Sequence, residues 1–140
     1  MDRSWFDAMA ADTRDRPDVY RKLGVADLRL VVEEVDAAGP RRFGLVLDGY
    51  EAVSVGELAD VDAFQPDAVV SGPREAWDDL AANIVRNGGA DGAHSLNALT
   101  ITDMPLRVTA PDPMGRDKFF RFAETLQTLF DALATAPIGA

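Results

Sequence analysis

The sequence has no cysteine, a single histidine and few basic residues. The absence of cysteine excludes disulfide frameworks, thiolate zinc sites and thiol nucleophiles, and it fits a reducing cytosol better than an oxidising compartment. Lys and Arg number 14 against 24 Asp and Glu, which gives a formal charge of −10. Phosphate backbones and anionic surfaces are repelled by such a charge at long range. We therefore expect no nucleic-acid partner.

Long hydrophobic runs are also missing. No apolar stretch approaches the roughly 20 residues that a membrane-spanning helix needs, and residues 1–7 lack the cationic region and apolar run of a secretion signal. We expect neither export nor stable membrane insertion, and a bacterial cytoplasm is the simplest location.

The overall composition is that of a globular protein. The chain has 140 residues, of which 47% are hydrophobic and 27% are charged, enough for one substantial core. No repeat or disordered linker interrupts it. We expect a single domain over residues 1–140, with a helical preface at 1–25 and the folded core at 26–135.

Four segments in the first half of the sequence favour β-strands. Residues 26–37, 43–49, 50–58 and 68–70 are rich in β-branched and apolar residues, partly in alternation with polar ones. The turn signal at 38–41 predicts an antiparallel hairpin, because the connection it makes is short. Because the connections are short, we expect the first three strands to form an antiparallel meander.

A helix is predicted after the fourth strand. Pro73 suits the first helical position, and the glycines at 88–89 suit the helix end. The apolar stripe between them is Trp77, Leu80, Ala81, Ile84 and Val85, at helical spacing.

The last third of the sequence predicts a short strand and a long helix. Residues 93–99 favour a helical turn and 99–102 favour a strand, whereas 106–109 fit a last strand. The segment 116–134 is strongly amphipathic. Its apolar face is Phe119, Phe122, Ala123, Leu126, Leu129, Phe130 and Leu133. Together the elements predict one α+β unit in which this helix packs on the sheet.

Two patterns that often carry chemistry are incomplete. His94 lies beside Ser95 but lacks the glycine-flanked nucleophile turn of a hydrolase, so a solvent-facing loop histidine is favoured over a catalytic base. Asp60 and Asp62 begin like a calcium loop, yet Gln65 stands where that loop needs glycine. A solvated acidic turn is the better interpretation.

The remaining patterns are explained by structure or composition. The glycines at 88–92 follow a helix and lack the lysine and hydroxyl pair of a phosphate-binding loop. Paired carboxylates, as at 33–34 and 78–79, are frequent in an acidic protein and nominate no acid and base. We therefore expect no enzyme activity, no metal and no cofactor.

The order of these elements resembles the sterol carrier protein type 2 family. The segments that carry the resemblance are the strands over 43–70, the helix start at 71–77, the strand at 106–109 and the aromatic helix at 119–130, within a match over roughly 26–135. Where the family often has a glycine-aspartate pair, residues 110–113 are Ala-Pro-Asp-Pro. The resemblance implies a divergent bacterial member with a mainly antiparallel, five-stranded twisted sheet covered by helices, and a cavity for lipid between sheet and helices.

We therefore expect a non-catalytic carrier of a lipid, fatty acid or sterol-like ligand. The residues expected to line its cavity are Trp77, Leu80, Ile84, Phe119, Phe122, Leu126, Leu129 and Phe130. An amphipathic helix with this many phenylalanines also commonly just fills a core. The alternative function is an interaction module whose apolar helix face binds a partner protein or a second copy of the chain.

Overall fold

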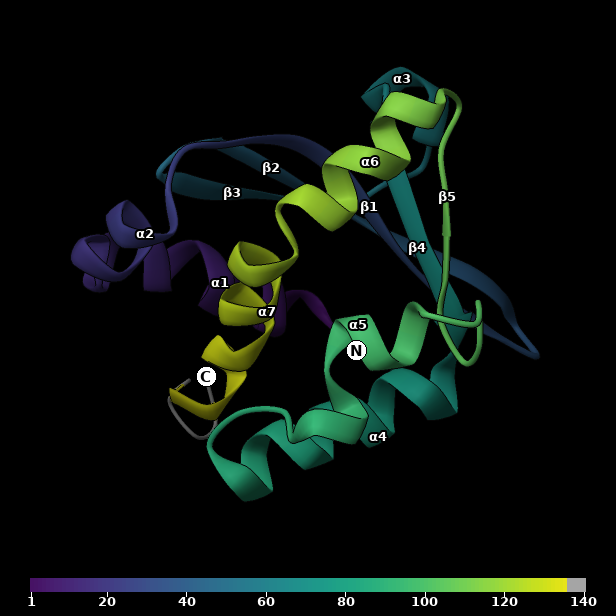
Figure 1. Cartoon of the computed structure of the whole chain (residues 1–140). Helices are drawn as coiled ribbons and strands as arrows, with labels where there is room; N and C mark the ends of the chain where they lie inside the picture. The colour runs from purple at the N-terminus through teal and green to yellow at the C-terminus, as the bar shows by residue number, and fades with distance from the viewer. Residues whose placement is uncertain (136–140) are drawn as a thin grey trace.

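A five-stranded sheet forms the centre of the computed structural model, which describes residues 1–135 (Figure 1). The last five residues of the expected domain lie outside the described residues. In chain order the elements are α1 (Arg3–Asp15), α2 (Pro17–Leu23), β1 (Ala26–Asp36), β2 (Gly39–Gly49), β3 (Glu51–Glu57), α3 (Val61–Phe64), β4 (Ala68–Pro73), α4 (Arg74–Asn87), η1 (Gly92–His94), α5 (Leu96–Thr100), β5 (Arg107–Thr109), α6 (Pro113–Arg121), α7 (Ala123–Asp131) and η2 (Ala132–Thr135).

The sheet is mixed, so the prediction of a mainly antiparallel sheet is wrong. Its strand order is β3-β2-β1-β4-β5. β1, β2 and β3 form the predicted antiparallel meander, but β4 pairs with β1 in parallel, from Leu30 opposite Ala68 to Val35 opposite Pro73. The cause is the connection over 58–67, which crosses the sheet and carries α3, because a parallel partner cannot be reached through a hairpin.

The structure also changes one predicted boundary and one predicted strand. β4 continues through Pro73, so Pro73 precedes the first residue of α4 and is not itself the first helical residue. Gly88 ends that helix as predicted, with φ of 74°. The strand predicted over 99–102 is wrong, because the segment belongs to the α5 region. There the Ser95 hydroxyl accepts a hydrogen bond from the Ala98 backbone N–H at 3.1 Å, so a cap starts a helical turn.

The helix predicted over 116–134 is divided into α6 and α7. Phe122 lies between them with φ −99° and ψ 20°, outside helical geometry, although its N–H still donates to the carbonyl of Lys118. Pro113 is the first residue of α6, and Asp112 caps that helix by accepting from the Met114 N–H at 2.8 Å. The Pro-Asp-Pro segment therefore starts a helix as well as ending the strand.

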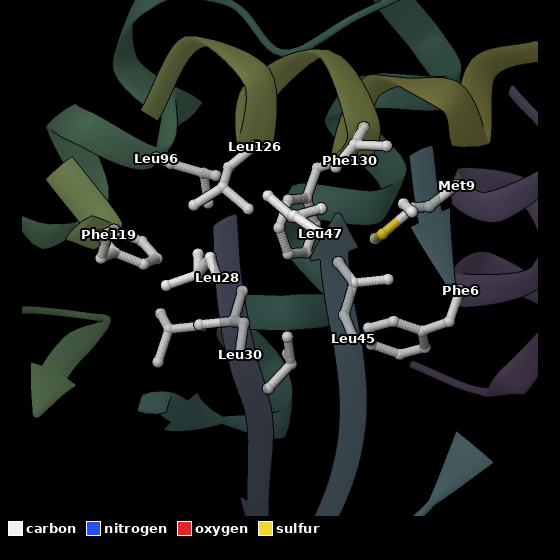
Figure 2. Packing of buried hydrophobic residues seen from close by; sticks show 14 of the residues in the cluster. Phe6, Met9, Leu28, Leu30, Leu45, Leu47, Leu96, Phe119, Leu126 and Phe130 are labelled. Carbon is white, nitrogen blue, oxygen red and sulfur yellow. The ribbon is translucent and has the colours of Figure 1, made fainter. Parts of the chain in front are cut away.

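The core lies between one face of the sheet and the helices. Alternate residues of β1 and β2 point into it, and α1, α6 and α7 contribute the side chains opposite them (Figure 2). Leu28, Leu30 and Leu45 are fully buried there. We call this the inner face of the sheet. The opposite face, the outer face, is crossed by the 58–67 connection, whose Phe64 ring lies against Gly44.

Candidate functional site

The eight residues predicted to line a cavity are brought together in one core. Seven of them have 0–1% of their surface exposed, and Phe122, which is partly buried, packs against the same cluster. The Trp77 and Phe130 rings are stacked, with centroids 6.1 Å apart and an interplanar angle of 18°. These ring contacts lie between the sheet and the helices, where the resemblance places a ligand.

Trp5 completes this aromatic cluster from the N-terminal helix. Its ring meets Phe130 edge-on at 5.5 Å and Trp77 edge-on at 6.4 Å. Its indole N–H donates to the Phe130 carbonyl at 3.0 Å, and the Trp77 indole N–H donates to the Glu33 carbonyl at 2.9 Å. Sequence reasoning missed this role of Trp5, because periodicity shows the apolar face of a helix and not its distant partner.

The outer face of the sheet carries a groove made of two adjoining pockets. The polar pocket has a volume of about 590 Å³ and the apolar pocket about 520 Å³. Val61, Asp62, Val69 and Thr109 line both. None of the eight predicted residues lines either pocket. Both volumes fall within the usual range of small-molecule sites.

The apolar pocket lies between α3 and the segment after β5. Five of its eight lining residues are apolar: Val61, Pro66, Val69, Ala110 and Pro111. Two of the five are prolines in connections, and the proline ring presents hydrocarbon without losing side-chain entropy when it is covered. The pocket can therefore desolvate part of an apolar ligand.

A row of polar side chains forms the floor of the polar pocket. Arg42 on β2, Glu33 on β1, Ser71 on β4 and Arg107 on β5 occupy opposite positions on successive strands. Arg42 Nε donates to Glu33 Oε2 at 2.6 Å, and Ser71 Oγ donates to Glu33 Oε1 at 2.7 Å. Both carboxylate oxygens of Glu33 therefore accept hydrogen bonds from side chains of neighbouring strands.

Arg29 holds the wall of the groove in place. Its Nε and Nη2 donate to the Phe64 carbonyl at 3.0 and 2.6 Å, and its guanidinium lies 4.3 Å from the centroid of the Phe64 ring. The Arg29 backbone N–H donates to Asp67 Oδ2 at 2.8 Å. These contacts attach α3 and the start of β4 to β1, so the groove is bounded by fixed structure.

Comparison with solved structures identifies the architecture. A crystal structure of sterol carrier protein 2 matches with a TM-score of 0.64 and 13% identity over 98% of both chains. A solution structure of a conserved hypothetical protein from Thermus thermophilus, described as a candidate sterol carrier protein, matches with a TM-score of 0.55 and 14% identity over 99% of this chain and 92% of that one. The chain has the sterol carrier protein 2 fold. No family model and no curated protein matches the sequence.

The resemblance drawn from the sequence is thus confirmed at the level of the sterol carrier protein 2 fold. Within residues 1–135 no helix is long and apolar enough to cross a membrane. Among the same residues, no group of three or more His, Asp or Glu side chains is placed to hold a metal ion.

His94, the single histidine in this sterol carrier protein 2 fold, contacts two carboxylates. Its Nδ1 lies 2.7 Å from Asp91 Oδ1 and its Nε2 lies 2.9 Å from Asp79 Oδ2. The contact with Asp91, together with that to Asp79, raises the pKa of His94 above its ordinary 6.5. Hydrogen bonds from Asn83 and His94 lower the pKa of Asp91 to about 2. The ring therefore joins α4 to the following loop, a structural role that the sequence did not show.

Proposed function

We propose that the chain binds a lipid or other apolar small molecule and holds it without transforming it. The sterol carrier protein 2 fold supports this proposal, since the solved neighbours bear that name. The observation that carries it is the groove on the outer face, where an apolar pocket adjoins a polar one. Such a groove can desolvate a hydrocarbon chain and leave a polar end in a polar environment.

We place the ligand in the groove because of the cost of entering the core. A ligand between the sheet and the helices would have to separate the stacked Trp77 and Phe130 rings and the Trp5 ring that meets both. Close-packed side chains lose their dispersion contacts when they are parted. The groove is open to solvent and needs no such separation. The interior location remains a prediction, and the experiment below tests both.

A groove-filling substitution provides the test. Thr109 is exposed on β5 and lines both pockets. We expect Thr109→Trp to weaken binding of a fluorescent fatty acid by about tenfold, which is about 1.4 kcal/mol of lost binding free energy. Thr102→Trp makes the same change at an exposed site in the α5–β5 connection and is expected to bind like the original chain.

The outcomes of this experiment distinguish binding in the groove from binding in the interior. If both variants fold and bind like the original chain, the ligand is not in the groove and the interior location is the one to pursue. If the original chain binds no fatty-acid or sterol probe, and native mass spectrometry detects no copurified lipid, the carrier function is wrong. Bound lipid recovered with altered mass after incubation would show catalysis and contradict the non-catalytic part of the proposal.

A further inference from the structure

Positive and negative side chains occupy different parts of the polar pocket. On the floor, the positive charge of Arg42 is matched by Glu33, its partner at 2.6 Å. The Arg107 side chain, at the other end of the row, forms no hydrogen bond or ion pair with any residue of 1–135. Its guanidinium is therefore the unmatched cation of the groove floor.

The wall of the same pocket carries the opposite charge. Asp60 and Asp62 line the polar pocket from the start of α3. The Asp60 side chain accepts one hydrogen bond, from the Ala63 N–H at 3.2 Å, which caps the helix. In the described part of the chain, neither carboxylate lies within 4.0 Å of a cationic nitrogen. The pocket thus has one unmatched cation on its floor and two unmatched anions on its wall.

This distribution discriminates between headgroups of different charge. A purely anionic headgroup is attracted by Arg107 and repelled by Asp60 and Asp62. A purely cationic headgroup is repelled by Arg107 and attracted by the two carboxylates. A headgroup that contains one charge of each sign can meet both. A neutral headgroup gains from neither.

We propose that the groove selects a single-chain amphiphile with a zwitterionic headgroup. Its anionic group binds Arg107, its cationic group lies toward Asp60 and Asp62, and its hydrocarbon chain extends over Val69 into the apolar pocket. The apolar pocket, at about 520 Å³, has the size of a site for one small molecule. This inference rests on the proposed function and adds the class of ligand.

A panel of surfactants with one common chain tests the headgroup preference. The probes are dodecylphosphocholine, dodecanoate, dodecyltrimethylammonium and dodecyl maltoside, each below its critical micelle concentration, measured by titration calorimetry at low salt. We expect dodecylphosphocholine to bind about threefold to fivefold tighter than either singly charged probe, since an exposed ion pair contributes at most about that factor. The difference is expected to shrink as salt is added.

Charge-removing variants assign the preference to the groove. Arg107→Gln should weaken dodecylphosphocholine binding and favour dodecyltrimethylammonium, whereas Asp60→Asn combined with Asp62→Asn should favour dodecanoate. Arg86→Gln on α4 and Asp117→Asn on α6 are matched exposed controls outside the groove lining, and they should leave the order of the probes unchanged.

Failure of this inference differs from failure of the proposed function. If all four probes bind with equal affinity, or if the order survives the charge-removing variants, the headgroup assignment is overturned while apolar binding stands. If no probe binds at any salt concentration, the proposed function fails together with it. A protein segment that occupied the groove would contradict the proposed class of ligand. Light scattering tests this, because a dimer that no longer binds the probes would show that a second copy of the chain covers the groove.

Discussion

Gly115 lies where α6 passes the residue before β4. A β-carbon at this position would be 1.8 Å from the Asp67 carbonyl oxygen and 2.7 Å from the Asp67 carbonyl carbon, which are backbone atoms that cannot rotate away. We expect Gly115→Ala to lower the free energy of unfolding by about 1–3 kcal/mol in urea denaturation. Gly92→Ala is the control, since a β-carbon there meets no atom within 4 Å. Equal stability of the two variants would show that α6 is not held this closely.

His94 gives the chain a pH-dependent contact. Because its pKa is raised in the folded state, protonated His94 stabilises the fold fully below pH 6.5, and this contribution is lost as the pH rises through the folded-state pKa. Asp91 acts in the opposite direction, since its contribution is present above pH 3.8 and is lost as the pH falls toward about 2. The contact is therefore strongest between pH 3.8 and 6.5.

Titration of the single histidine by NMR checks this assignment. We expect a His94 pKa above 6.5, and a lower value in Asp79→Asn, which removes one of the two carboxylates. We also expect the stability difference between the original chain and His94→Gln to be larger at about pH 5.5 than at about pH 8.5. A histidine that titrates at or below 6.5 would mean that the carboxylates do not hold it in solution.

Apolar spacing predicted most of the buried helix residues but not what surrounds them, and Val85 of the predicted stripe is 61% exposed. The helical spacing of Leu80, Ile84 and Leu126 placed them correctly in the core. It could not distinguish a filled core from a cavity wall, because both require the same apolar face. Arg42, Glu33 and Ser71 carried no signal either, since they come together only through the register of three strands.

At the scale of elements, α3 is the shortest α-helix of residues 1–135, and Arg29 supplies three of the contacts that hold it. Removing the Arg29 side chain takes away both donors to the Phe64 carbonyl and the cation over the Phe64 ring. We expect Arg29→Ala to destabilise the local structure by about 1–2 kcal/mol and to speed amide exchange over residues 61–65. Hydrogen-exchange mass spectrometry measures this directly.

The matched control is Arg86→Ala on α4, because Arg86 is exposed and its side chain makes no hydrogen bond or ion pair within the described ranges. Its exchange over residues 61–65 should match that of the original chain. If Arg29→Ala shows the same protection there as the control, the helix is held by its other contacts, and the groove wall does not depend on Arg29.

Element types were more predictable than their pairing. Strand composition and the turn signal predicted over 38–41 indicated the hairpin of β1 and β2, although the turn itself is at 37–38, and Gly88 ended α4 as expected. The parallel partner of β1 could not be predicted, since β4 is six residues long and its sequence says nothing about direction. The break at Phe122 was also hidden, because the apolar spacing continues across it.

At the scale of the whole molecule, the net charge of −10 governs how a carrier would meet a membrane. We expect the rate of lipid uptake from anionic phosphatidylglycerol vesicles to rise with salt, because added ions screen the repulsion. Uptake from phosphatidylcholine vesicles should change little. Stopped-flow fluorescence with a labelled lipid measures both. A rate from anionic vesicles that falls with salt would point instead to a local cationic docking surface.

The fold as a whole was accessible from the sequence in a way that the site was not. The sequence of elements was sufficient to suggest the sterol carrier protein 2 fold, and structural comparison confirmed it. The groove depends on how the 58–67 connection passes over the outer face, which is a property of topology. Its lining comes from residues within 31–42, 59–71 and 107–111, which meet only once the five strands are in order.

The crossover between β3 and β4 has a consequence for engineering. This connection covers part of the outer face. Lengthening or shortening it would therefore change the size of the groove without touching the aromatic core on the inner face. The groove and the aromatic interior therefore lie on opposite faces of the sheet. A library confined to the exposed residues 59, 62, 63 and 65 would vary this connection and leave the contacts between Arg29 and Phe64 in place.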